Sequence, residues 1–577
     1  MATGDPIPIR FPLSSFPGAS TQESAGRLLN CTAEPIDDPQ QPSGPAKQVW
    51  RRQPGLSQHN NAATGQTGYR GGLIVTNLSY ETWSGNASTI DVNGTYASLG
   101  AFPGTKKVSI ARDLAASPDV VAVDIDNGAY ILSGGGAPTA YNGGGNLPQP
   151  NSISFQDGFF FYTIADGRVF ASPINSVGTI NTQTFVKLQS KSDVTLLRGI
   201  AYSGLMFFFT TGGCEVWQDT AQPSPAFPYS RLTTIPFGLL QANAIAGWET
   251  GFDDLIWAAQ DFGVYRLSWA TFQPIKVSSP DVDRFIESEN RKGNLLDAGV
   301  YEYAGKKFWT ISSNAASVTW EFNLSTQKWN ERSSLLASTG QQSRWRGSGG
   351  HPAFGKWLMG DIQSGNLLYV DDTNYTENGA PQLFRIESGP VDNFPNQIRV
   401  ARADFDFVMG VGQAVLSVVM TVLGTSSGTG GVVRLRVNNT ANVITGDTVN
   451  VVNVGGTTEA NGTWAVNVID AFNIDLIGTT FVHAWTSGGT ATDVTAPDNM
   501  VNPQVAVSIS KDGGLNWGNP LLRSIGQQGR SRRVRASVKS MGLSGPMGCR
   551  WRLDVTDPVY TGFIKATQAS DPRYVGD

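Results

Sequence analysis

The sequence has few of the residues on which most catalytic and metal-binding sites depend. Among 577 residues there are three cysteines and three histidines, and charged residues make up 15%, against roughly 25% in an average soluble domain. Cys31, Cys214 and Cys549 are far apart and odd in number, which argues against a disulfide framework or a cysteine-based metal site. We therefore expect no metal and no cofactor.

The histidines give no more support for chemistry than the cysteines do. His59, His351 and His483 fall in three different segments and lack the spacing of paired metal ligands. Each is interpreted as a surface or turn residue. The sequence also lacks a Gly-x-Ser-x-Gly elbow, a phosphate loop, an HExxH motif and a dinucleotide fingerprint. The glycine runs Gly134–Gly136 and Gly143–Gly145 lack a following helix with Lys-Ser/Thr, so they are interpreted as loops.

Carboxylate pairs are the remaining catalytic option, because a glycosidase needs only two carboxyl groups that face each other across a cleft. Three such pairs occur: Asp253-Asp254, Asp371-Asp372 and Asp281/Asp283. Neighbours on a strand point to opposite faces, and neighbours in a turn are usually solvated. No catalytic role is expected for them, and the protein is not expected to be an enzyme. Trp345, between two arginines, is open to two interpretations: a residue of the hydrophobic core, or a surface residue that stacks on sugars or a partner.

Positive charge is also scarce. The formal net charge is −5 and the pI is about 5.4, so tight nucleic-acid binding is disfavoured. The one dense basic run contains Arg530, Arg532, Arg533 and Arg535, followed by Lys539. On a strand these side chains would be divided between two faces, which fits a solvated strand or subunit-interface salt bridges better than a DNA groove.

Long hydrophobic segments are nearly absent. Residues 1–10 lack the charged and apolar regions of a secretion signal, so we expect synthesis in a reducing cytoplasm without export by that route. Phe407–Gly424 is uncharged and approaches the length of a membrane span. It is rich in valine and partly alternates from Val415, which favours a strand pair. No membrane anchor is expected.

What the sequence does contain is a hairpin-like pattern that returns about every fifty residues: an apolar, aromatic-rich run, a short polar turn and a second apolar run. The seven copies are Gly72–Val75 with Tyr80–Trp83, Val120–Val123 with Ala129–Leu132, Gly158–Tyr162 with Arg168–Phe170, Gly204–Phe209 with Cys214–Trp217, Asp254–Trp257 with Gly263–Leu267, Gly305–Trp309 with Val318–Phe322, and Gly355–Met359 with Leu367–Val370. A β-rich unit of this period predicts a β-propeller. We predict an all-β protein whose propeller has six or seven blades, with seven favoured.

Composition divides the rest of the chain. Residues 1–60 are rich in Pro, Ser, Gln and Asn and predict an extended N-terminal arm, followed by the propeller at 61–395. Residues 396–427 and 494–577 alternate as half-buried strands and predict a C-terminal β-domain. Residues 428–493 are rich in Val, Asn, Thr and Gly and predict a small β-module inserted in that domain, similar to a module found on several phage tail proteins.

The C-terminal region contains a turn motif close to the Asp-box pattern Ser-x-Asp-x-Gly-x-Thr-Trp. Its residues are Ser510, Asp512, Gly514 and Trp517, with Asn516 where threonine is usual. The aspartate accepts backbone hydrogen bonds within the turn, and glycine supplies an unusual dihedral angle. The motif is therefore interpreted as structural, although it also occurs in sialidase-like enzymes.

Several short stretches resemble the packaged-DNA-stabilisation, or tail-nozzle, proteins of short-tailed bacteriophages. They are Trp50–Leu56, Phe208–Trp217, Phe227–Arg231, Asp261–Leu267, Lys328–Ser334, Phe354–Asp361 with Ser364-Gly365 and Leu368-Tyr369, Ser510–Trp517, Ile525–Gly529 and Arg552–Pro558. The likeness covers most of residues 45–412 and 500–566. The segment at about 428–493 is a departure from the shorter members of the family.

This resemblance implies a structural protein of the virion tail. Family members form a ring, usually of six copies, below the portal and adaptor, and they support the tail needle, spikes or fibres. The ring surrounds the DNA exit channel, helps to retain the packaged genome and guides its ejection, and the family offers no catalytic residues to transfer. Six chains at −5 each would carry −30, which suits a channel that does not bind its passenger. The inserted module would be an outward attachment or host-contact surface.

Two alternatives remain open at this point. The Asp-box and the tryptophans are compatible with a carbohydrate-binding or glycan-hydrolysing β-propeller. A host-side scaffold propeller is the third interpretation.

Overall fold

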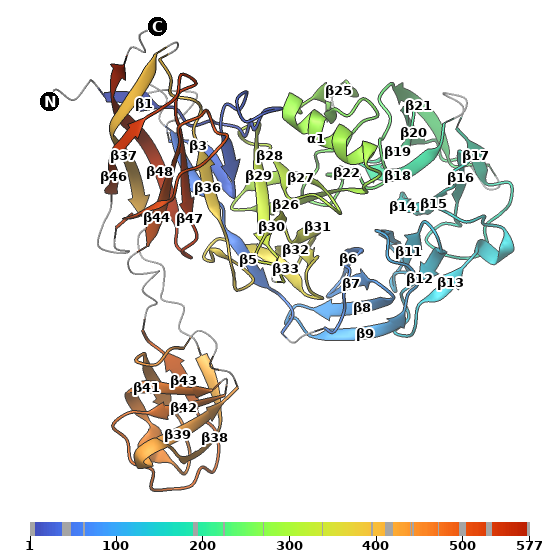
Figure 1. Ribbon diagram of the computed structural model, residues 1–577. Coiled ribbons are helices and arrows are strands. Elements are labelled where there is room, and N and C mark those ends of the chain that lie inside the picture. Colours follow the sequence, from blue (N-terminus) through green and yellow to red (C-terminus); the bar gives the residue numbers. More distant parts are fainter. Residues whose placement is uncertain are drawn as a thin grey trace.

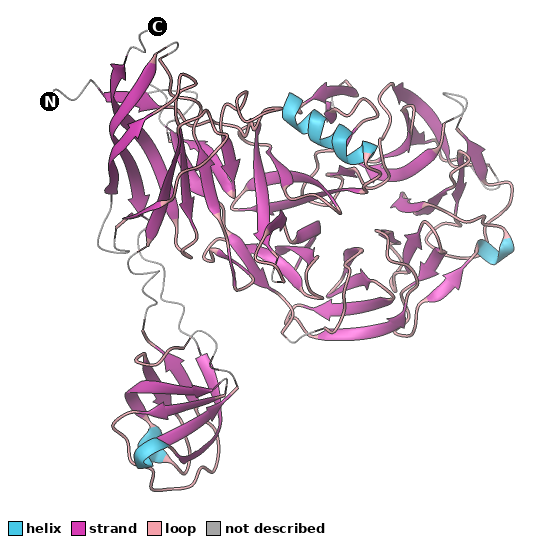
Figure 2. Ribbon diagram, in the orientation of Figure 1, coloured by secondary structure: helices cyan, strands magenta, loops and turns pink. Residues whose placement is uncertain are grey.

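The computed structural model is almost entirely β-structure (Figures 1 and 2). It describes residues 6–36, 48–61, 64–188, 194–222, 226–268, 271–336, 338–393, 396–409, 419–438, 440, 443–470, 472–495, 503–526 and 533–573. The described strands form three bodies: a propeller, a two-sheet sandwich and a small closed barrel. The all-β propeller fold predicted from the repeats is confirmed.

Four-stranded antiparallel units follow one another around the propeller ring (Figure 1). The first five are separate sheets: β6–β9 (Gly71–Val75, Leu78–Trp83, Asn86–Asp91, Tyr96–Ala101), β10–β13 (Ser109–Arg112, Val120–Asp124, Gly128–Ile131, Thr139–Tyr141), β14–β17 (Ser152–Gln156, Phe159–Thr163, Arg168–Ala171, Phe185–Lys187), β18–β21 (Leu196–Tyr202, Leu205–Thr210, Cys214–Asp219, Tyr229–Ile235) and β22–β25 (Ile245–Ala246, Ile256–Ala258, Val264–Ser268, Gln273–Lys276).

Two further units belong to larger sheets. One is β26–β29 (Leu296–Tyr303, Lys306–Ser313, Thr319–Asn323, Lys328–Leu335), with β30 (Gln342–Arg344) paired to β29. The other is β31–β33 (Gly347–Ala353, Lys356–Asp361, Leu367–Asp371), whose fourth strand is the N-terminal β5 (Gly55–Gln58); β34 (Thr376–Glu377) and β35 (Ala380–Pro381) complete its sheet. The described residues therefore contain seven four-stranded units.

The most apolar strands of each unit are the middle ones, because neighbouring blades cover both of their faces. The clearest case is β19, in which Met206 to Phe209 are all fully buried. Six of the seven hairpins in the sequence coincide with the second and third strands of a unit, and the first coincides with β6 and β7. The one α-helix of the described residues, α1 (Pro280–Arg291), was not predicted. It lies between β25 and β26 and packs Val282 and Ile286 into the propeller core.

The sandwich joins strands from both ends of the chain. One sheet has the order β3 (Cys31–Pro35), β4 (Gln48–Arg52), β48 (Thr561–Arg573), β37 (Gln397–Met409), β46 (Arg533–Leu543), with β1 (Pro6–Ile9) also paired to β48. The other has the order β2 (Arg27–Leu29), β36 (Phe384–Glu387), β47 (Arg550–Val555), β44 (Gln504–Ser510), β45 (Leu521–Ser524). Phe405 of the first sheet and Trp551 of the second meet in the core at a ring distance of 5.3 Å.

The first 60 residues differ from the expected extended arm. They contain β1 to β5, which pair with strands of the sandwich and the propeller. Strand β2 is the critical one, because it pairs in parallel with β29 of the propeller and antiparallel with β36 of the sandwich. One hydrogen-bonded sheet thus runs from β26 in the propeller to β45 in the sandwich.

The inserted module is a closed barrel that lies apart from the other two bodies in Figure 1. Its strands, in order around the barrel, are β38 (Val419–Ser427), β39 (Val433–Val437), β42 (Asn473–Leu476), β41 (Gly462–Asp470), β40 (Thr448–Val452) and β43 (Thr490–Asp493). It begins nine residues before the predicted start at residue 428. It has its own core, which includes Val433, Leu435, Ile474 and Leu476.

Candidate functional site

An N-terminal segment packs against the last unit of the propeller at a junction that we call the closing seam. We define it as Trp50–Leu56 together with the side chains packed on it. Strand β5 of this segment pairs with β33 and so supplies the outermost strand of the last unit. Gly55 fits there because an added Cβ would lie 2.0 Å from the backbone oxygen of Thr376. The Arg52 side chain is 2% exposed and donates hydrogen bonds to Gln382, Tyr375, Asp557 and Val559.

A buried charged cluster from the propeller completes the seam. Arg332, Glu321 and Glu377 have fully buried side chains. The Arg332 guanidinium lies 3.4 Å from Glu377 Oε1 and 3.9 Å from Glu321 Oε2, and its Nη2 donates to the Pro54 carbonyl at 3.1 Å. Gln53 donates to Glu321. Because an unpaired buried charge is costly, this network favours a single position for the N-terminal segment.

The electrostatics of the cluster follow from burial. Burial raises the pKa of Glu377, and the nearby charge of Arg332 partly opposes that shift. Burial alone would lower the pKa of Arg332, but Tyr301, Glu321 and Glu377 raise it above its usual value. For Arg52, burial lowers the pKa to about 10. The arginines therefore stay charged at neutral pH, and their role is to hold chain segments together.

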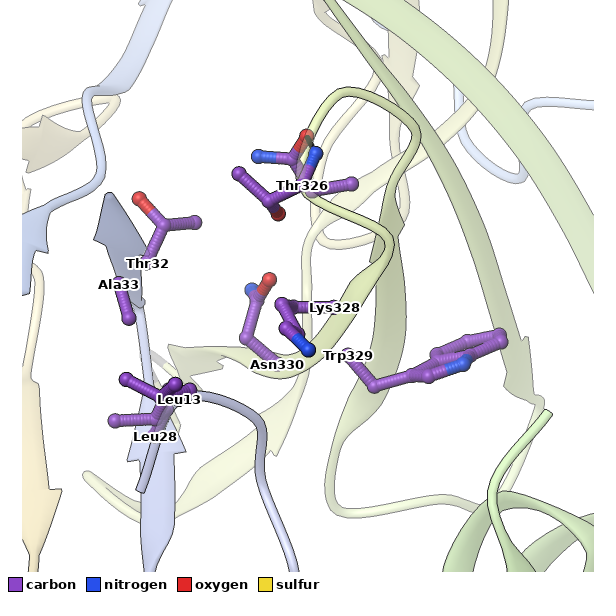
Figure 3. A pocket seen from close by; sticks show the side chains of 9 residues that line it. Leu13, Leu28, Thr32, Ala33, Thr326, Lys328, Trp329 and Asn330 are labelled. Carbon is purple, nitrogen blue, oxygen red and sulfur yellow. Dashed lines mark hydrogen bonds between the residues drawn. The ribbon is translucent and has the colours of Figure 1, made fainter. Parts of the chain in front are cut away.

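The same N-terminal region also packs against the start of β29, where a close-up view shows Thr32 and Ala33 opposite Thr326, Lys328 and Asn330 (Figure 3). The depression between them leaves no measurable volume for a water-sized molecule. A backbone hydrogen bond holds the N-terminal region against β29, since Ser15 N donates to the Trp329 carbonyl at 2.7 Å. The surfaces are packed together, and this depression is a junction rather than a ligand site.

The Asp-box-like turn joins β44 and β45 at the edge of the sandwich. Asp512 Oδ1 accepts hydrogen bonds from Ser510 Oγ at 2.7 Å and from Asn516 N at 3.0 Å. The backbone hydrogen bond from Asn516 is the main reason that the pKa of Asp512 falls to about 2. Gly514 has a φ of 107°, and Arg552 stacks 3.9 Å from the Trp517 ring centroid. The hydrogen bonds from Ser510 and Asn516 hold the Asp512 carboxylate within the turn.

The three histidines lie in separate surroundings. His59 stacks on Phe354 at a ring distance of 5.4 Å, and burial lowers its pKa. His351 is 5% exposed and lies 2.8 Å from Ser79 Oγ and 3.2 Å from Glu81 Oε1. His483, in the barrel, faces Glu459 at 3.3 Å. No group of three or more His, Cys, Asp or Glu side chains that could hold a metal ion occurs in the described part of the chain.

The carboxylate pairs are likewise separated on different elements. Asp254, beside β23, makes an ion pair with Arg266 at 2.6 Å, and Asp371 at the end of β33 accepts from Ser57 Oγ at 2.8 Å. Asp281 and Asp283 lie in the first turn of α1, where they pair with Arg284 and Lys276. Asp254, Asp371, Asp281 and Asp283 are each held by local partners. Among the described residues the structure does not bring two pairs together across a cleft.

The remaining residues singled out in the sequence are structural or fall partly outside the described residues. Trp345 is 2% exposed and lies under the Arg332 guanidinium at 4.2 Å, so it is a core residue. All three cysteines are buried, and none of them forms a disulfide bond. Arg530 and Arg532 lie outside the described residues, whereas Arg535 and Lys539 are on β46.

Phe407–Gly424 is described only at its two ends, which belong to β37 and β38. Among the helices of the described chain, none is long and apolar enough to cross a membrane. The closing seam leaves no local signal in the sequence, because its partners are far apart: Gln53 and Glu321 are 268 positions apart in the chain.

The ring of four-stranded units, closed by an N-terminal strand, defines a β-propeller protein. Within that class, the chain belongs to the phage-stabilisation family described as "Bacteriophage P22 Gp10, beta-propeller", whose model matches residues 34–375. The resemblance found in the sequence is thereby confirmed, and the family match places the chain among bacteriophage proteins. The matched region begins within the N-terminal strands and covers the propeller.

Solved structures with similar folds include a streptogramin B lyase (13% identity, 55% of this chain and 97% of that chain, TM-score 0.37). Others are the WD40 β-propeller domain of Doa1 (9% identity, 55% and 96%, TM-score 0.34) and the computationally designed Ika8 protein (10% identity, 63% and 100%, TM-score 0.33). No curated protein matches the sequence.

Proposed function

We propose that this chain is a structural subunit of the phage tail, one of six copies in a ring around the DNA exit channel. The ring helps to retain the packaged genome and guides its ejection, and the chain performs no catalysis. The observation that carries the proposal is the continuous sheet from β26 to β45, which fuses propeller and sandwich through β2. A protein that holds DNA under pressure has to resist distortion, and a shared hydrogen-bonded sheet restrains motion between the two bodies.

The family supports the same role, since it is named for stabilisation in a bacteriophage. In this proposal the partners are a second copy of the chain, the portal-adaptor ring on one side, and a needle, spikes or fibres on the other. DNA passes without specific binding, in keeping with the net charge of −5. The barrel serves as an outward attachment or host-contact surface, because its strands pair only with one another among the described residues.

The test is genome retention in particles assembled without this chain. Phage carrying a disrupted gene should yield heads that lose their DNA, and the full chain supplied in trans should restore filled, infective particles. Quantification of DNA-filled heads by electron microscopy and of protected DNA by nuclease treatment measures the effect. Normal numbers of filled, infective particles without the chain would contradict the proposal.

A further inference from the structure

The propeller encloses a central cavity that the structural role does not require. Its volume is about 700 Å³, which lies within the roughly 300–1,000 Å³ of small-molecule sites. The first strands of the units, β6, β10, β14, β18, β22, β26 and β31, contribute its walls. Its lining is thus made of segments that are already fixed by the blades, as a preformed site requires.

Positive charge is concentrated in this cavity although the chain as a whole is acidic. Four cationic side chains line it, against the two carboxylates Glu249 and Asp297. Two of the cations have close partners: Arg70 makes a fully buried ion pair with Asp124, and Lys107 lies 3.5 Å from Asp297. The other two are Arg112 and Arg198.

Neither of these arginines makes an ion pair within 4 Å among the described residues, although Glu249 and Asp297 act on the Arg198 charge at longer range. Arg198 Nη1 donates to the Ala242 carbonyl at 3.1 Å and to Asn243 Oδ1 at 3.2 Å, and its Cζ lies 4.7 Å from the Trp248 ring centroid. In the described part of the chain no acidic group lies within 4 Å of Arg198. The Arg112 side chain makes no hydrogen bond or ion pair there, and its backbone pairs with Val120 in the sheet.

Some buried arginines elsewhere are neutralised, as Arg332 is by Glu321 and Glu377 and Arg346 is by Asp361. Arg52 and Arg550 are also buried, but neither lines the cavity. The cavity therefore contains two guanidinium groups that no carboxylate within 4 Å neutralises among the described residues. A guanidinium presents several N–H donors in a plane that matches the oxygens of carboxylate, phosphate or sulfate.

Glu249 is the one lining carboxyl group without a cationic partner within 4 Å among the described residues. Its Oε2 accepts from Gly247 N at 2.7 Å. Burial raises the pKa of Glu249 to about 7, and Arg198 and His351 act in the opposite direction. Arg198 faces it from β18 and His351 from β31, and Lys107 and Asp297 line the same cavity. Near neutral pH this carboxyl is thus partly protonated and able to donate a hydrogen bond.

We propose that the central cavity is a binding site for a small oxyanion, a molecule that carries sulfate, phosphate or carboxylate groups, held by Arg112 and Arg198. The ligand oxygens replace cavity water at the two guanidinium groups. Trp248 provides an apolar wall beside Arg198. The site is independent of the ring proposed above and does not depend on its being correct.

Titration calorimetry on the full-length protein tests the site, with sodium sulfate and sodium citrate as probes and sodium chloride at equal ionic strength as the reference. We expect saturable binding of one sulfate or citrate per chain. Arg112→Met and Arg198→Met should each weaken it about tenfold or more, because each removes charged hydrogen bonds. Arg291→Met on the exposed side of α1 is the matched control and should leave the dissociation constant unchanged.

Melting temperatures without ligand establish that the variants fold. Absence of saturable binding beyond the chloride reference would overturn the proposal, as would equal affinity in folded Arg112→Met and Arg198→Met. If Arg291→Met weakened binding as much as the cavity variants do, the effect would reflect the general loss of a positive charge. That result would also overturn the proposal.

The pH dependence provides a second readout with sulfate, which stays fully ionised between pH 6 and 8. As pH rises through about 7, Glu249 loses its proton and repels the anion, so sulfate should bind more weakly at pH 8 than at pH 6. Glu249→Gln should bind at pH 8 as the unaltered protein does at pH 6. Identical pH profiles for the two proteins would contradict a place for Glu249 beside the anion.

Discussion

At the residue scale, the structure gives a specific role to Trp50–Leu56. The sequence identified this stretch only by its resemblance to a phage family. Its contacts show why these residue types occur: Arg52 and Gln53 enter a buried polar network, and Gly55 passes closer to Thr376 than any side chain would allow. The partners come from segments hundreds of positions away, so local sequence patterns could not identify them.

Gly55→Ala should therefore destabilise the protein. The added methyl group would meet the backbone of Thr376 at 2.0 Å, and relief of that overlap would displace β5, at a cost of about 1–3 kcal/mol. Chemical denaturation, followed by tryptophan fluorescence, measures the loss. Gly136→Ala is the matched control, since nothing lies within 4 Å of its Cβ position, and it should change stability by less than about 0.5 kcal/mol. Equal stability of the two variants would contradict the packing described at the seam.

At the scale of elements, the sequence predicted best the strands that are buried on both faces. Continuous apolar runs such as Leu205–Thr210 mark the middle strands of the units. The innermost strands carry glycine and polar residues toward the central cavity, and the outermost strands are partly exposed, so neither has a strong pattern. Strand β31, for example, contains Gly347, Gly349 and Gly350, and in β21 only the two end residues, Tyr229 and Ile235, are buried.

Helix α1 was missed even though its signals are local. Pro280 occupies its first turn with Asp281 and Asp283, and Arg291 lies in its last turn, as helix termini favour. Asp281 and Asp283 also fit a carboxylate pair on a strand or turn, so they do not by themselves predict a helix. A helix of 12 residues between two propeller units interrupts the strand repeat, and the repeat therefore gives no indication of it.

The barrel is the element that should be removable. It has its own buried core, and its described strands pair only within the barrel. Replacement of residues 410–502 by a short Gly/Ser linker should leave the melting temperature of the propeller and sandwich within about 2 °C of the full chain, because no core residue of either is lost. Differential scanning calorimetry measures this. A fall of 10 °C or more would show that the barrel stabilises the other two bodies.

At the scale of the whole molecule, the propeller class followed from the repeat, and the connection between bodies did not. The N-terminal 60 residues, expected as an arm, contribute strands to both the propeller and the sandwich. The sequence of these 60 residues shows no sustained hydrophobic period, because each of their strands is short and pairs with a different region. Strand pairing between distant segments leaves little trace in a single sequence, which is why the fused sheet through β2 was not foreseen.

The central claim is that this propeller protein is a building unit of a ring at the phage tail. Electron cryomicroscopy of the purified full-length protein, together with reconstruction of the virion tail, tests it most directly. The account predicts a closed ring, with six copies around an open channel, at the base of the portal. A virion tail that lacks density for this propeller, or a chain that stays monomeric alone and is absent from the particle, would contradict it.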